Sequence, residues 1–140
     1  MSKPPVIMWF RRDLRLDDNK ALHAAIASGQ PVIPLFVFDP AILKSPRVGA
    51  PRLKFMLQAL DSMATELHKH QRDLLIRHGD PAQLIPALIA ETDATALYYN
   101  IDYTPYAVKR DEQIVNALAI EAHGYHDRLL APPGTVEKKD

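Results

Sequence analysis

Residues 9–19 read Trp-Phe-Arg-Arg-Asp-Leu-Arg-Leu-Asp-Asp-Asn, between a short apolar run and a helical pattern that begins at Lys20. This position corresponds to the first strand-to-helix junction of an α/β unit, and open parallel sheets bind their ligands at such junctions. Dinucleotide-binding proteins place glycines there, so that the backbone can approach a pyrophosphate. Here the junction carries three arginines and three aspartates instead. The sequence therefore predicts a loop built from side-chain charge.

The chain alternates between apolar runs and helical patterns, the apolar runs being residues 6–10, 32–38, 74–76 and 96–99. This alternation is typical of a doubly wound parallel α/β sheet with helices on both faces. Because crossovers between parallel strands are right-handed, we expect the strand order 3-2-1-4, with any fifth strand at the edge beside the fourth. The first run is therefore predicted to be a central strand.

Three helices are indicated after the second strand. The clearest apolar period lies within residues 52–70, where Leu53, Met56, Leu57, Leu60, Met63, Ala64 and Leu67 form one stripe. A helix with Asp80 as N-cap and Pro81 in its first turn is predicted next. The last helix is expected from Thr104 to Gly124, with glycine as its terminator. That boundary leaves little room for a fifth strand, which is expected to be short, displaced or missing.

The composition limits the classes of function. A chain of 140 residues fits one domain, and no segment reaches the length of a membrane span. The absence of cysteine excludes disulfides and thiolate metal sites, and it fits a cytoplasmic location. Seventeen basic residues balance seventeen acidic ones. Since a protein that holds DNA by itself normally carries a basic excess, DNA binding by this chain alone is disfavoured.

The charged loop has two interpretations. Its arginines are an anion or chromophore site at the carboxyl edge of the sheet, with Arg11 nearest the end of the strand, or they form a salt-bridged loop. In the second case Asp17 or Asp18 caps the following helix. No histidine, serine or paired-carboxylate arrangement indicates a catalytic or metal site elsewhere.

Two residues depart from the helical patterns around them. Asp111 falls on the same stripe as Ile114 and Leu118, so its carboxylate faces the sheet and needs a basic partner, for which Arg11, Arg12 and Arg15 are the candidates. Phe55 lies about 160° away from the apolar stripe of its helix. It is either a lone exposed residue or the wall of a ligand or domain contact.

Five motifs in this order resemble the N-terminal domain of the photolyase and cryptochrome flavoproteins. They are residues 9–19, then 35–40 (Leu-Phe-Val-Phe-Asp-Pro), 52–57 (Arg-Leu-Lys-Phe-Met-Leu), 79–81 (Gly-Asp-Pro) and 100–106 (Asn-Ile-Asp-Tyr-Thr-Pro-Tyr) with Arg110 and Asp111. The resemblance implies an antenna domain over residues 1–131. Residues 132–140 would then begin a linker to a helical domain that holds FAD and meets damaged DNA.

The resemblance also implies which residues hold the antenna. They are Phe10, Arg11, Phe36, Phe38, Asp39, Phe55, Asp102, Tyr103 and Tyr106. Structural ion pairs are expected from Arg12, Asp13, Arg15, Arg110 and Asp111.

One departure from the family narrows the choice of chromophore. Folate-binding members carry an Asn-Glu pair before the Arg-Asp motif, where this chain has Tyr106 and Ala107. The resemblance therefore implies an 8-hydroxy-deazaflavin or FMN in preference to a folate. The parent would be a photolyase that repairs pyrimidine dimers, or a cryptochrome, and this part alone would be inactive. The alternative is a stand-alone nucleotide-binding or protein-interaction module without photochemistry.

Overall fold

A computed structural model describes residues 4–11, 14, 16, 19–38, 50–101 and 105–126, with the side chains of residues 50–53 and 105–107 outside that description. Five parallel strands form one sheet in the order β3-β2-β1-β4-β5. The strands are β1 (Val6–Phe10), β2 (Val32–Phe38), β3 (Leu75–His78), β4 (Ala96–Asn100) and β5 (Glu121–Tyr125). The predicted fold class and the central place of β1 are thus confirmed.

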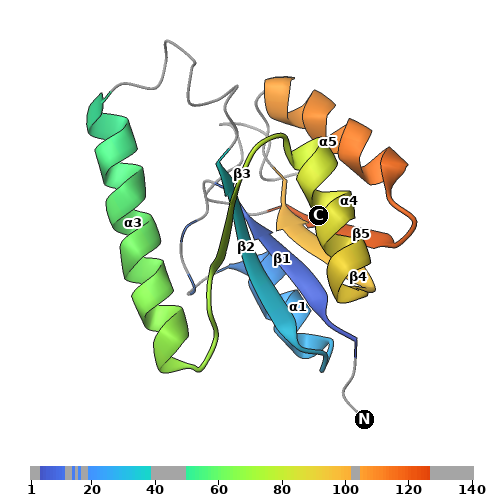
Figure 1. Cartoon of the computed structure of the whole chain (residues 1–140), viewed down its shortest axis with the longest axis horizontal. Helices are drawn as coiled ribbons and strands as arrows, with labels where there is room; N and C mark the ends of the chain where they lie inside the picture. Colours follow the sequence, from blue (N-terminus) through green and yellow to red (C-terminus); the bar gives the residue numbers. More distant parts are fainter. Residues whose placement is uncertain are drawn as a thin grey trace.

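The helices cover both faces of the sheet (Figure 1). On one face lie α1 (Lys20–Ala27) and α3 (Ala50–Lys69), which pack against a core that includes Met8, Phe10 and Phe36. On the other face lie α4 (Pro81–Thr92) and α5 (Pro105–Ala117), which pack against Ile7, Trp9 and Leu97. The strand order reverses between β1 and β4, and this is the position where open α/β sheets form a ligand crevice.

Strands β1 and β2 are apolar throughout because helices cover both of their faces. Every residue of β1 is buried. Pro34 lies within β2, although a proline cannot donate to a sheet ladder. The pairing of β2 with β3 begins only at Leu35, so β2 is flanked by β1 alone at the level of Pro34. Pro34 is therefore tolerated in β2 because the edge strand β3 is short and its pairing with β2 starts beyond the proline.

The end of the chain differs from the prediction. Helix α5 ends at Ala117 and Gly124 lies in β5, so the glycine is not the helix terminator and the fifth strand begins three residues before it. Two rings hold β5 in place, because His123 and Tyr125 pack on Tyr98 of β4 with centroids 4.9 and 6.3 Å away. Gly124 also lets β5 approach Tyr99, since a Cβ there would lie 2.9 Å from the tyrosine ring.

Helix α3 confirms part of its predicted stripe. Leu60, Met63 and Leu67 are buried in the core, whereas Leu57 is 47% exposed, so its assignment to the apolar stripe was wrong. Leu57 lies at the edge of the stripe, on a part of the helix surface that does not face the sheet. Across the described ranges, no helix combines the length and apolar character needed to cross a membrane.

Candidate functional site

The crevice between β1 and β4 is filled by an ion pair. Arg11, directly after β1, donates from Nη1 to both carboxylate oxygens of Asp111 on α5, at 2.7 and 2.6 Å. Its Nη2 donates to the backbone oxygen of Asn100 at the end of β4. Both side chains of the pair are at most one-tenth exposed. The predicted bond from the arginine loop to Asp111 is therefore confirmed, and Arg11 is the partner.

Aromatic rings enclose this ion pair. The Arg11 guanidinium lies 4.7 Å from the centroid of Trp9 and 5.3 Å from that of Tyr99. A second guanidinium, from Arg110, lies 5.2 Å from the Trp9 ring, with its Nε 3.6 Å from Asp111. Burial raises the pKa of the Tyr99 phenol, and the Asp111 carboxylate raises it further, while Arg11 acts in the opposite direction. The cluster joins β1, β4 and α5 through charge and ring contacts.

Two buried asparagines connect the same sheet edge to α1. Asn19 is the N-cap of α1, and its Oδ1 accepts from the Leu22 amide at 3.1 Å. Asn100 accepts on Oδ1 from the Ala21 amide at 3.1 Å and donates from Nδ2 to Asn19 at 2.8 Å. Neither side chain is exposed. The amides of Ala21 and Leu22, in the first turn of α1, are therefore satisfied by side chains of the chain itself.

This arrangement determines what the crevice can bind. In nucleotide-binding α/β folds, a phosphate accepts from the free amides at this helix amino-terminus. Here Asn19 and Asn100 already accept from those amides, and Arg11 is turned to Asp111. A phosphate bound in that manner would have to displace these two asparagine oxygens.

The other predicted site residues fall into three groups. Phe10 is fully buried and Phe36 is 4% exposed, so both rings belong to the core. Phe38 is partly exposed at the end of β2, and Phe55 is 72% exposed on α3. Outside the described residues or side chains lie Arg12, Asp13, Arg15, Asp17, Asp18, Asp39, Asp102, Tyr103 and Tyr106.

Sequence reasoning missed several residues of this edge. The helix cap is Asn19 and not an aspartate before it, because the asparagine directly precedes the first helical residue. His78, at the end of β3, stacks on Phe38 with centroids 4.9 Å apart and planes at 14°. Asn100 carried one usable signal, since a polar residue ends an otherwise apolar strand. Within the described part of the chain, no three metal-binding side chains gather into a possible metal site.

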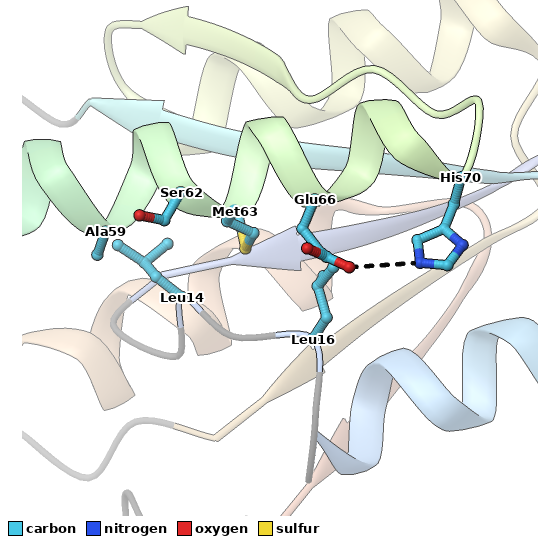
Figure 2. Close-up of a pocket in the computed structure, with 7 residues that line it drawn as sticks. All are labelled: Leu14, Leu16, Ala59, Ser62, Met63, Glu66 and His70. Atoms are coloured by element: carbon cyan, nitrogen blue, oxygen red, sulfur yellow. Dashed lines mark ion pairs between the residues drawn. The ribbon is translucent and has the colours of Figure 1, made fainter.

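A cavity of about 540 Å³ lies apart from the ion pair, between α3 and the loop that follows β1. Figure 2 shows Leu14 and Leu16 of the loop facing a row of α3 side chains. The row consists of Ala59, Ser62, Met63, Glu66 and His70. The lining combines the apolar side chains of Leu14, Leu16 and Met63 with polar ones, and Glu66 and His70 form a polar end, where the Glu66 carboxylate lies 3.7 Å from the His70 imidazole.

The sequence matches a family model described as DNA photolyase over residues 6–140. An uncharacterized 31.6 kDa protein of Synechococcus sp. (strain PCC 6716) is 39% identical over 98% of this chain and 49% of its own length. The deoxyribodipyrimidine photo-lyase of Synechococcus sp. (strain ATCC 27144) is 38% identical over 94% of this chain. The chain spans only 28% of that photolyase.

Solved structures agree with these matches. The cryptochrome of Synechocystis sp. PCC6803 superposes with a TM-score of 0.83 and 30% identity, over 90% of this chain and 28% of the cryptochrome. An archaeal photolyase from Sulfolobus tokodaii, solved with two FAD molecules, superposes with a TM-score of 0.81 and 33% identity, over 91% and 30% of the two chains. The chain belongs to the DNA photolyase family and corresponds to the N-terminal α/β domain of its members.

Proposed function

We propose that this chain is the antenna domain of a photolyase or cryptochrome and that it binds a light-harvesting chromophore at the carboxyl edge of the sheet. Family membership and the match to about 28% of photolyase length support this role. The bound chromophore would absorb near-ultraviolet or blue light and pass its excitation to FAD in a helical domain. We infer that residues 1–131 form the antenna domain and that residues 132–140 begin the linker.

The filled crevice between β1 and β4 is the observation that carries this proposal. Because Asn19 and Asn100 satisfy the amides that a nucleotide phosphate would use, recognition has to depend on the faces and edges of a ring system. This disfavours the alternative of a stand-alone nucleotide-binding module. Small-molecule sites combine apolar and aromatic walls with a few polar partners, as a planar chromophore requires.

Two aromatic residues support a site for a planar ring. Phe38 and the stacked His78 lie at the carboxyl ends of neighbouring strands, and Phe55 is exposed on the helix that leaves the same edge. We propose that Phe38 and Phe55 contact the ring and that Asp39, Asp102, Tyr103 and Tyr106 complete the site. Arg11 would then support the site indirectly, because its ion pair with Asp111 holds β1 and α5 together at this edge of the sheet.

We propose a deazaflavin or flavin, such as 8-hydroxy-deazaflavin or FMN, in preference to a folate. The Sulfolobus tokodaii photolyase, which contains two FAD molecules, supports a flavin-type antenna. Tyr106 and Ala107 stand where folate-binding relatives carry their Asn-Glu pair.

Repair is proposed for the whole protein and not for this part of it. The chain has a formal net charge of zero, whereas DNA binding normally needs basic side chains that displace counterions. A helical FAD domain of the same polypeptide, working in the cytoplasm, would supply the redox cofactor and the contact with damaged DNA. Alone, the chain should neither repair dimers nor bind duplex DNA with submicromolar affinity at physiological salt.

The direct test is titration of the purified chain with 8-hydroxy-deazaflavin, FMN and a folate, followed by absorbance and fluorescence. We expect the deazaflavin or FMN to bind more tightly than the folate. Phe38→Ala should weaken binding about tenfold or more, because each lost aromatic contact removes on the order of 1 kcal/mol besides its buried area. Ile76→Ala, which truncates an exposed apolar residue of β3, is the matched control. Tighter folate binding would contradict the chromophore assignment.

A further inference from the structure

The rings of Phe38 and His78 form a stack at the carboxyl edge of the sheet. Phe38 ends β2 and His78 ends β3, and the two residues are directly paired in the parallel register. Their ring centroids are 4.9 Å apart and their planes differ by 14°. This separation equals the spacing of neighbouring strands, as expected for two side chains that stand side by side on one face of a sheet. His78 therefore covers the face of the Phe38 ring that is turned toward β3.

Two further contacts hold Phe38 in place. The ring of Phe36, two residues earlier on the same strand, meets it edge-on, with centroids 4.9 Å apart and planes at 80°. The Gly79 amide donates to the Phe38 carbonyl oxygen at 3.0 Å, so the pairing of β2 with β3 continues past His78. Gly79 has a φ of 138° and Asp80 caps α4, so the chain leaves the strand directly after the histidine. The stacked pair is thus fixed through both its rings and its backbone.

Strands β1 and β2 end at different levels of the sheet. Strand β1 ends at Phe10, which pairs with Phe36, whereas β2 continues for two more residues to Phe38. The side of the Phe38 ring opposite His78 therefore faces the region beyond the end of β1. This is the side of the reversal point between β1 and β4, where open α/β sheets bind their ligands.

On the antenna role proposed above, we infer that His78 is a positioning residue, which fixes Phe38 so that the planar chromophore stacks on the ring face turned toward β1. His78 closes one face of the phenyl ring, and a flat ligand then has the opposite face to stack on. A wall that is rigid before binding costs less conformational entropy when the ligand arrives. His78 therefore raises the affinity for the chromophore without touching it.

Substitution separates this role from direct binding by the imidazole. A histidine that bonds the chromophore needs its ring nitrogens, whereas a histidine that supports Phe38 needs only a flat ring. His78→Phe keeps the flat ring and removes the nitrogens, and His78→Gln keeps a polar group and removes the ring. Because His78 is exposed, these substitutions should leave the fold intact.

The test is titration of the 140-residue chain with 8-hydroxy-deazaflavin and FMN. We expect His78→Ala and His78→Gln to weaken binding about three- to tenfold, because Phe38 loses its stacking partner and its fixed orientation. His78→Phe should stay within about twofold of the wild type, since the stack is restored. His23→Ala, at an exposed histidine of α1, is the matched control and should bind like the wild type.

Nuclear magnetic resonance of a chain labelled in its phenylalanine and histidine rings reports which face is used. Without chromophore, His78→Ala should shift the Phe38 ring signals, whereas His23→Ala should not. Saturating chromophore should shift the signals of Phe38 more than those of His78, because the phenyl ring lies between the ligand and the imidazole.

Wild-type affinity in His78→Ala would overturn the positioning role, as would equal losses in His78→Phe and His78→Ala. Larger chromophore-induced shifts at His78 than at Phe38 would put the ligand on the outer side of the stack and also overturn it. In these outcomes the wild type still binds, so the antenna role would stand. Absence of binding by the wild type would overturn both proposals together.

Discussion

The Arg11 guanidinium and the Asp111 carboxylate form a two-pronged ion pair across the reversal point of the sheet, with both distances below 2.8 Å. Asp111→Ala should lower the free energy of unfolding by about 3–5 kcal/mol, because it leaves a buried guanidinium without its carboxylate. Denaturant unfolding followed through Trp9 fluorescence measures the loss. Glu112→Ala, at the exposed neighbouring position of α5, should change stability by less than about 0.5 kcal/mol. A small loss in Asp111→Ala would show that the pair does not hold the edge together.

Substitution of either paired asparagine should destabilise the fold more than the small size of the side chain suggests. Asn100→Ala removes the acceptor of the Ala21 amide and the donor to Asn19, so we expect a loss of about 2 kcal/mol. Asn116→Ala, on the exposed side of α5, serves as the comparison and should be nearly neutral. Equal stability of the two variants would argue against the network as a determinant of the fold.

Stability should decrease in alkaline solution. The pKa of Tyr99 is raised above its ordinary value of 10.0, chiefly by burial, so the folded state favours the neutral phenol. A group of this kind stabilises the fold fully below its unfolded pKa, and the contribution is lost as the pH rises through the folded pKa. The free energy of unfolding should therefore fall above about pH 10. In Tyr99→Phe the fall should be shallower, with the remainder due to Tyr98, whose pKa is also raised. An identical alkaline slope in the variant would contradict this origin.

Gly124→Ala should strain the contact between β4 and β5. The added methyl group would meet the Tyr99 ring at 2.9 Å, and the ring cannot turn freely because Arg11 and Trp9 pack beside it. We expect a loss of about 1–3 kcal/mol in thermal or denaturant unfolding. Tyr99→Leu in the same chain should recover part of the loss, and a strictly additive double mutant would show that the ring is not the obstacle.

The fold was largely predictable because its central strands are continuous apolar runs with helical patterns between them. Such a chain has few arrangements with right-handed crossovers, and the observed order is the expected one. The place of the fifth strand beside the fourth was predicted correctly, but its start was misplaced, because Glu121–Tyr125 is short, polar and contains a glycine that also fits the end of the preceding helix. It forms because rings of β4 and β5 stack, and a tertiary contact of this kind leaves no local sequence signal.

The ion pair was predictable for a different reason. The 3.6-residue period put the carboxylate of Asp111 on the buried face of its helix, and a buried carboxylate needs a cation. The amide pair of Asn19 and Asn100 was not predictable, because the two residues are separated by 81 positions and only the folded sheet brings them together. For the same reason, the sequence did not predict that these asparagines bind the amides of α1.

The cap of α1 by a residue of β4 has a consequence for the order of folding. A helix of eight residues is marginal by itself in water, and the acceptor for its Ala21 amide lies 79 positions later in the chain. During synthesis, α1 should therefore remain unprotected against amide hydrogen exchange until β4 has emerged and docked against β1. The amino-terminal third of the chain would then fold late, together with the rest, although it is made first.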